Sequence, residues 1–234
     1  MVVGLYALSL FGLEHSRVLR ASYLPIRFVD DLLDGDAHGV PDPLAYAQEL
    51  SQRIEHDNLT NSRIDRQLRY ALEVLEPRAL PTDNPRGDFI KAIQAIIFDY
   101  ERASVKRLLS AKEIEQYFRD SFDPVINITL LAISSKLRSH NLPVLSYGQG
   151  RVYSARDFET DWKRGIINVP EDIISSAGFF PDSPLIRTWF SQNLAKTKPD
   201  LIADQSVIRQ SGERQTQIVC NALISPLLKF IEVY

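Results

Sequence analysis

The sequence is short of the residues that cross-link or interrupt a chain. Its 234 residues include one cysteine, Cys220, and ten glycines. A single cysteine excludes an internal disulfide, which fits a reducing compartment, and the apolar neighbours Ile218 and Val219 indicate a packing role for it. We therefore expect a cytoplasmic protein that is held together by its core rather than by covalent cross-links.

A strong excess of charge of either sign is also missing. The chain carries 27 Lys and Arg residues against 30 Asp and Glu residues, which gives a formal net charge of -3. Proteins that bind nucleic acids usually have a basic balance or a basic patch, and here the basic residues are spread along the chain. We expect no nucleic-acid partner.

Long hydrophobic runs are lacking too. The apolar stretch from Met1 to Leu13 has no positive charge before it, which disfavours a signal peptide, and it is too short to span a bilayer. Two interpretations stay open for Val2 to Leu13. It is either a helix of the core or a peripheral contact with a membrane surface.

What the sequence does contain is helical periodicity. Apolar residues recur at spacings of three and four, as in Ile90, Ile93 and Ile97, whereas the alternation typical of strands is nearly absent. The length is sufficient for one substantial core. We predict an all-α fold with a single domain over residues 1–234.

Turn residues and capping side chains divide the chain into predicted helices. These run from residue 42 or 43 to about 54, from 61 or 62 to about 75, and from 88 past 100. Two prolines conflict with the pattern, because proline removes a helical hydrogen bond. We expect a kink or break near Tyr23, before Pro25, and an interruption of a central helix at Asp123 and Pro124, beside the proposed site.

The first acidic cluster contains Asp30, Asp31 and Asp34. Asp30 and Asp34 are four residues apart, so on a helix both carboxylates project from one face. The residues around them are apolar, which indicates that this turn lies against the core. Carboxylates held together in such a place favour a bound cation.

The second acidic cluster repeats this spacing with Asp157 and Asp161. Magnesium prefers oxygen ligands and is usually held by a few carboxylates together with substrate phosphate, so two opposed aspartate pairs suit a diphosphate bridged by several ions. Charged residues four apart on a helix more often belong to a solvated surface than to a binding site. For either cluster taken alone, a solvated surface stays an open interpretation. Basic residues that could bind the remaining phosphate oxygens are Arg27, Arg156, Lys163 and Arg164.

The context of these clusters resembles a known family. The segment from Tyr153 to Pro170 is similar to the second aspartate motif of squalene and phytoene synthases, with matches at Arg156, Asp157, Asp161, Arg164, Gly165 and Pro170. The segment from Arg27 to Asp34 resembles the first motif of the same family, with Arg27, Asp30, Asp31 and Asp34 in register. Order and spacing agree over most of Leu5 to Pro170, and more loosely in the middle region from Phe89 to Tyr117.

This resemblance implies an orthogonal helical bundle around a central cavity, as in isoprenoid synthases. It implies Mg²⁺ bound by Asp30, Asp31, Asp34, Asp157 and Asp161, and a substrate site formed by Arg27, Arg156, Arg164 and Tyr153. The implied reaction is the head-to-head condensation of two prenyl diphosphates, farnesyl or geranylgeranyl, with release of diphosphate. NADPH would be needed only if the product is squalene.

The chain departs from the family pattern at several positions. Tyr153, Ile166 and Asn168 replace the usual asparagine, arginine and tyrosine, and Asp123-Pro124 lies where the family has a small, glycine-containing helix. These changes leave metal and diphosphate binding in place but bear on the second half of the reaction. Two alternatives therefore stay open: a terpene cyclase or prenyl diphosphate hydrolase on the same fold, and a non-catalytic relative that acts in binding or assembly.

Side chains outside the two motifs are harder to assign. Asp99 follows an apolar run and is expected either to bond a neighbouring helix or to reach the site. Aromatic faces attract positive charge, so aromatic residues are candidates for lining a cavity that holds a carbocation. They are Tyr6, Tyr23, Phe28, Phe98, Tyr100, Phe118 and Phe122.

Overall fold

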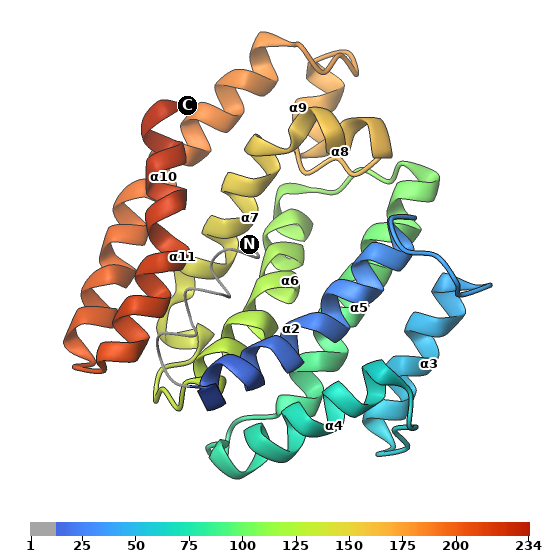
Figure 1. Ribbon diagram of the computed structural model, residues 1–234. Coiled ribbons are helices and arrows are strands. Elements are labelled where there is room, and N and C mark those ends of the chain that lie inside the picture. The colour runs from blue at the N-terminus through green and yellow to red at the C-terminus, as the bar shows by residue number, and fades with distance from the viewer. Residues whose placement is uncertain (1–12) are drawn as a thin grey trace.

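The computed structural model describes residues 13–234, and every regular element in this range is a helix (Figure 1). The predicted all-α fold is confirmed. The α-helices are α2 (Leu13–Leu33), α3 (Pro43–Glu55), α4 (Arg63–Leu75), α5 (Pro85–Val105), α6 (Ala111–Ala132), α7 (Pro143–Arg156), α8 (Phe158–Arg164), α9 (Glu171–Ser176), α10 (Pro184–Gln210) and α11 (Arg214–Val233). Two short 3₁₀ turns, η2 (Glu76–Arg78) and η3 (Ser139–Asn141), lie between them.

Side-chain caps set where several helices begin. The side chains of Asp42 and Ser62 accept backbone N–H bonds from the first turns of α3 and α4, as the sequence predicted. Helix α5 begins earlier than expected, at Pro85, because the side chain of Asn84 caps it by accepting the N–H of Gly87. Helix α6 opens with a capping box formed by Ser110 and Glu113.

The predicted break of α2 before Pro25 and the predicted interruption of α6 at Asp123 and Pro124 are wrong. Helix α2 continues through Pro25 and helix α6 continues through Pro124. Proline already has a helical φ and loses a single hydrogen bond, and both prolines are buried, so packing of the flanking apolar residues offsets that loss. The Asp123 side chain accepts a hydrogen bond from Ser146 of α7 and is not among the residues that line the cavity described below.

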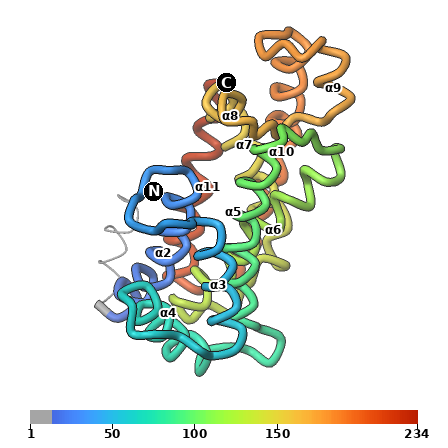
Figure 2. Tube along the Cα trace, turned by 90° about the vertical axis from the view of Figure 1, so that its right-hand side faces the viewer, coloured from blue at the N-terminus to red at the C-terminus, as the bar shows by residue number. Residues whose placement is uncertain are grey.

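The helices pack around one large core. Helices α5 and α6 lie side by side in both views, and α10 and α11 pair along one side of the molecule (Figures 1 and 2). The main hydrophobic cluster includes residues from α2 to α11, such as Val18, Leu72, Phe89, Leu145 and Ile224. Cys220 belongs to this cluster and is fully buried, which confirms its packing role.

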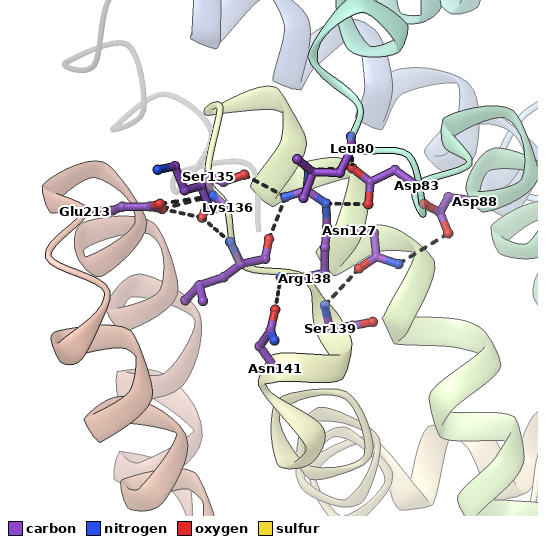
Figure 3. Close-up of polar contacts among 11 residues, drawn as sticks. Leu80, Asp83, Asp88, Asn127, Ser135, Lys136, Arg138, Ser139, Asn141 and Glu213 are labelled. Carbon is purple, nitrogen blue, oxygen red and sulfur yellow. Dashed lines mark hydrogen bonds and ion pairs between the residues drawn. The ribbon is translucent and has the colours of Figure 1, made fainter.

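A buried polar network joins the lower part of the fold (Figure 3). Arg138 is 3% exposed, and its guanidinium donates to both carboxylate oxygens of Asp83 at 2.9 and 2.6 Å. It also donates to the carbonyl oxygens of Ser135 and Leu137. The neighbouring Ser135 hydroxyl donates to Glu213, just before α11, at 2.6 Å. The network therefore connects three loops that are distant in sequence.

Membrane contact was one interpretation of the apolar start of the chain. Residues 1–12, which hold Tyr6 and nearly all of that stretch, lie outside the described residues. Within residues 13–234, one helix, Arg214–Val233, is long and apolar enough to cross a membrane by length and composition.

Candidate functional site

A cavity of about 490 Å³ opens where several helix ends meet. Its walls come from α2, α5, α6, α7, α8 and the loop that follows α8. Figure 1 shows the C-terminal ends of α2, α5 and α7 together with α8 in the upper half of the view. Carboxylates and aromatic rings both line this cavity. The carboxylates are Asp30, Asp34, Asp99 and Asp161, and the rings are Tyr100, Tyr117, Phe118, Phe122 and Tyr153.

The last turns of α2 deliver the first acidic cluster. Val29 and Leu32 are buried in the core, whereas Asp30 and Leu33, three residues apart on the helix, both line the cavity. Asp34 follows directly after the helix, and its backbone N–H still bonds to the carbonyl of Asp30. The predicted helical spacing of the two carboxylates therefore holds to the end of α2.

Arg27 is paired with two of these aspartates. Its Nη1 lies 2.6 Å from Oδ2 of Asp30, and its Nη2 lies 2.5 Å from Oδ1 of Asp31. Neither Arg27 nor Asp31 lines the cavity. They form an exposed rim next to it, with 44% and 31% of their side chains accessible.

The second acidic cluster lies at the junction of α7 and α8. The guanidinium of Arg156 donates two hydrogen bonds to the carboxylate of Asp157, from Nε to Oδ1 at 2.8 Å and from Nη2 to Oδ2 at 2.6 Å. This pair is not part of the cavity lining, whereas Asp161, one turn further on, is. The two aspartates are one helical turn apart, as the spacing predicted, but only Asp161 lines the cavity.

Gly165 fixes the end of α8 against α5. Its φ of 86° is left-handed, and a Cβ atom there would lie 2.7 Å from the carbonyl oxygen of Ala103. Only glycine meets both conditions without strain. The close approach keeps Asp161 and Arg164 at the cavity, beside the last turn of α5.

A direct ion pair joins the two motifs. Nη1 of Arg164 donates to Oδ2 of Asp34 at 2.7 Å, across a sequence separation of 130 residues. Both residues line the cavity. The two sequence segments that resemble the family motifs therefore meet in space.

The sequence analysis did not assign Arg102, a buried residue that is bonded to two residues of the cavity lining. Arg102 is 2% exposed; its Nε donates to Asp99 at 2.7 Å and its Nη2 donates to Asn168 at 2.6 Å. The Tyr117 hydroxyl donates to the other oxygen of Asp99, and the guanidinium lies 4.4 Å from the Tyr117 ring centroid. Asp99, Tyr117 and Asn168 all line the cavity. The signal available in the sequence was the charged pair Asp99 and Arg102, three residues apart, which follows the apolar run from Ile96 to Phe98.

Burial raises the pKa of Asp30, Asp99 and Asp161, which all line the cavity. Burial raises the pKa of Asp30 to about 6, with further contributions from Asp34 and Asp31. Burial likewise raises the pKa of Asp161 to about 6, and the nearby carboxylates of Asp157 and Asp99 add to the effect. Negative charge at the cavity is therefore only partly offset by arginine.

These features allow a test of the implied magnesium site. The donor set is made of carboxylate oxygens, and the raised pKa values show that added positive charge would be favourable, so donor type and charge fit a hard divalent cation. Within residues 13–234, no three acidic, histidine or cysteine side chains already converge at metal-binding distance. In the structure, arginines engage the oxygens of Asp30 and Asp34.

The predicted residues therefore divide into two groups. Asp30, Asp34, Asp161, Arg164 and Tyr153 line one cavity. The rim pairs Arg27 with Asp31 and Arg156 with Asp157 do not line it.

The aromatic candidates divide in the same way. Tyr100, Phe118 and Phe122 line the cavity, whereas Phe28 packs edge-on against Tyr46, away from it. Phe98 packs against Tyr117, behind the lining, and Tyr23 is not part of the lining either.

Comparisons with known proteins give no further assignment. No family model, no curated protein and no solved structure matches this chain.

Proposed function

We propose that this chain is a magnesium-dependent prenyltransferase that joins two prenyl diphosphates head to head and releases diphosphate. The observation that carries the proposal is the Arg164–Asp34 ion pair at one cavity, because it unites two motifs that resemble those of squalene and phytoene synthases. A cavity lined by both carboxylates and aromatic rings suits a substrate with a charged head and an apolar tail.

The diphosphate end of the substrate would lie at the carboxylates of the cavity. Asp30, Asp34 and Asp161 are the residues that would hold magnesium, which when bound neutralises the charge that develops on the leaving diphosphate. Arg164 is paired with Asp34, and its planar guanidinium has the geometry to donate two hydrogen bonds to phosphate oxygens. Arg27 and Arg156 lie at the rim and would orient the outer phosphate.

The prenyl tail would lie against the aromatic rings of the cavity. Phe118, Phe122 and Tyr153 supply an apolar surface that excludes water, and aromatic faces stabilise the allylic cation left when diphosphate departs. Arg102 acts through its neighbours: it holds Asp99 and Asn168 in place and does not line the cavity itself.

The test is a product assay with purified protein, magnesium and farnesyl or geranylgeranyl diphosphate. We expect release of diphosphate and a hydrocarbon or cyclopropyl product with the combined carbon count of two substrates, identified by mass. Asp34→Asn should abolish both. Absence of product with every prenyl diphosphate, in the presence of magnesium, would contradict the proposal.

The size of the cavity favours a second candidate, which uses one substrate. A volume of about 490 Å³ is in the range that encloses a single small ligand, whereas condensation requires room for two prenyl chains. A terpene cyclase or a prenyl diphosphate hydrolase would ionise one substrate at the same carboxylates. The mass assay separates the candidates, because these reactions give a product with the carbon count of one substrate.

A non-catalytic relative would behave differently from both enzymes. Calorimetry with magnesium and an unreactive thiodiphosphate analogue measures binding without turnover. Binding without product would indicate a binding protein for prenyl diphosphates, and absence of binding would indicate that the cavity has another role.

A further inference from the structure

A groove lies between α2 and α4 and shares no lining residue with the cavity described above. Its volume is about 530 Å³. Four of its eight lining residues are arginines, and we call it the arginine groove. The lining residues are Arg17, Arg20, Ala21 and Leu24 from α2, and Arg63, Arg66, Gln67 and Tyr70 from α4.

Helical periodicity explains how the groove forms. On each helix the lining residues fall at positions i, i+3, i+4 and i+7, which is a single stripe along the surface. The opposite sides of the two helices carry core residues such as Val18 and Leu72. Because α2 and α4 pack against each other, the two stripes form adjacent walls. Each wall presents two guanidinium groups followed by a larger apolar or aromatic side chain.

The four arginines of the groove are not paired with acidic residues in the part of the chain that the structure describes. No acidic residue lines the groove, and within residues 13–234 none of the four arginines forms an ion pair. Glu14 on α2 is paired with Arg78, and Asp65 on α4 is buried and bonded to Arg53. The sequence of residues 1–12 contains no Asp or Glu.

The guanidinium groups are also available to a ligand. All four arginines are exposed. Arg20 donates one bond to the carbonyl of Ser16 at 3.3 Å, and Arg66 donates one to the carbonyl of Asn61 at 2.6 Å. A guanidinium has five N–H donors, so these bonds orient the two side chains and leave donors for an anion.

We propose that the arginine groove binds the phosphate groups of an anionic phospholipid surface. Guanidinium forks match phosphate oxygens, and an anionic surface offsets the mutual repulsion of four like charges. Leu24 and Tyr70, which are 40% and 36% exposed at the same groove, favour a lipid over a free anion, since they supply apolar surface next to the charges. The proposal is independent of the proposed function.

The test compares the binding of the full chain to two kinds of vesicle. We expect binding to phosphatidylcholine vesicles that contain phosphatidylglycerol, weaker binding to phosphatidylcholine alone, and loss of the difference at high salt. Each arginine near an anionic surface contributes about fivefold to partitioning. Arg17→Gln with Arg63→Gln should therefore reduce binding about 25-fold, and replacing all four should abolish the preference.

Two arginines in the second half of the sequence provide a matched control. Arg209 and Arg214 are exposed arginines without an ion pair, and Arg209 donates to the carbonyl four residues back, as Arg20 does. Arg209→Gln with Arg214→Gln should leave vesicle binding unchanged. The groove variants change exposed side chains, so the melting temperatures of all variants should match that of the wild type.

Three outcomes would overturn the proposal. One is equal binding to both kinds of vesicle. Another is an equal loss of binding in the groove and control variants, which would indicate a general charge effect. The third outcome distinguishes a lipid headgroup from a soluble anion. If inorganic diphosphate without magnesium binds the wild type but not the groove variants, and if vesicle binding is the same in the wild type and the variants, the groove is a site for a soluble anion.

Discussion

The clearest single-residue prediction concerns Asp161. Burial and the nearby carboxylates raise its pKa to about 6, so its charged form is unfavourable in the metal-free protein. Asp161→Asn keeps the shape and removes that charge, and we expect the melting temperature at pH 7 to hold or rise. Activity with magnesium should fall by at least about a hundredfold, because charge stabilisation at the reacting group is lost. Thermal melting and turnover measured on one preparation check both expectations.

Glu159 provides the matched control on the same helix. It is exposed and does not line the cavity. Glu159→Gln should leave stability and turnover unchanged. If Asp161→Asn lowered stability and activity together, Asp161 would be holding the fold rather than the substrate.

Asp204 should give the protein a distinct pH dependence. Burial raises the pKa of Asp204 to about 6 from an ordinary 3.8. The hydrogen bonds that its carboxylate accepts from the N–H groups of Leu145 and Val144 lower the pKa, but they do not cancel the effect of burial. Because the folded pKa is the higher one, this residue favours folding at low pH, and that contribution is lost as pH rises from about 4 to 6. The pKa difference corresponds to about 3 kcal/mol.

Two substitutions separate charge from hydrogen bonding at this position. Asp204→Asn keeps an acceptor for the start of α7 and removes the charge, so stability above pH 6 should hold or rise and the slope between pH 4 and 6 should flatten. Asp204→Ala leaves the buried N–H of Val144 unpaired, whereas the N–H of Leu145 keeps its bond to the carbonyl of Leu142, so the change should cost about 1–3 kcal/mol. Urea unfolding at several pH values measures both. An unchanged slope in Asp204→Asn would exclude this residue as the titrating group.

At the residue scale, the sequence predicted what depends on local spacing. Asp30 and Asp34 lie on one turn, and their shared direction follows from helical geometry alone. The buried Arg102 was missed because its role depends on Asn168, which is 66 residues away. A pairing of that kind is set by how helices pack, which local spacing does not encode.

At the scale of elements, capping residues were reliable guides and prolines were not. Asp42 and Ser62 mark helix starts because they satisfy free N–H groups locally. Pro25 and Pro124 were expected to interrupt helices, but a single lost bond, worth about 3 kcal/mol, is outweighed when the helix buries several apolar side chains at about 1.5–3 kcal/mol each. Local signals therefore predict an element best where no tertiary burial competes with them.

Gly150 tests how closely two elements must approach. A Cβ atom at this position of α7 would lie 2.2 Å from Cγ of Phe118 on α6, and both residues line the cavity. Gly150→Ala should force the ring or the helix to move and destabilise the protein by about 1–3 kcal/mol. Because Phe118 forms part of the cavity wall, the same change should weaken binding of a prenyl thiodiphosphate.

Gly148 is the control two residues earlier on the same helix. There a Cβ atom would lie 3.2 Å from side-chain carbons of Leu201 and Thr197, a contact that small adjustments relieve. Alanine also lowers the entropy of the unfolded chain, which offsets that strain. Gly148→Ala should therefore be nearly neutral in urea unfolding. Equal effects of the two substitutions would mean that the contact with Phe118 is not what limits the packing of α7 on α6.

At the scale of the whole molecule, composition was enough to predict the fold class. Scarce glycine and helical periodicity correctly indicated an all-α protein, because both reflect the backbone directly. The arrangement of the helices was not predictable in the same way. The arginine groove, for example, requires α2 and α4 to be neighbours, and no spacing in the sequence relates residue 17 to residue 63.

The network around Arg138 is the feature that most depends on this arrangement. Its guanidinium is bonded to Asp83 and to two carbonyl groups, and the carboxylate side chain of Asp83 is 7% exposed (Figure 3). Arg138→Met should remove the partner of a buried carboxylate and destabilise the protein by about 3–5 kcal/mol. Urea unfolding measures the loss, and Arg119→Met, at a more exposed arginine, should cost far less.

The double variant Arg138→Met with Asp83→Leu decides whether the pair itself is stabilising. Burial alone would raise the pKa of Asp83, but the hydrogen bonds from Arg138 and the N–H of Leu80 hold it below its ordinary value. A depressed folded pKa means that the contribution is present above about pH 4 and is lost as the pH falls further. Replacing both charged groups by apolar ones removes the unpaired charge, so the double variant should recover much of the stability lost in Arg138→Met and should be less sensitive to acid than the wild type. The double variant could instead be as unstable as Arg138→Met at pH 7. In that case the loss of stability would come from the carbonyl groups of Ser135 and Leu137, which no longer receive hydrogen bonds from Arg138. Arg138 would then stabilise the loop that holds these carbonyl groups, and the ion pair with Asp83 would contribute little.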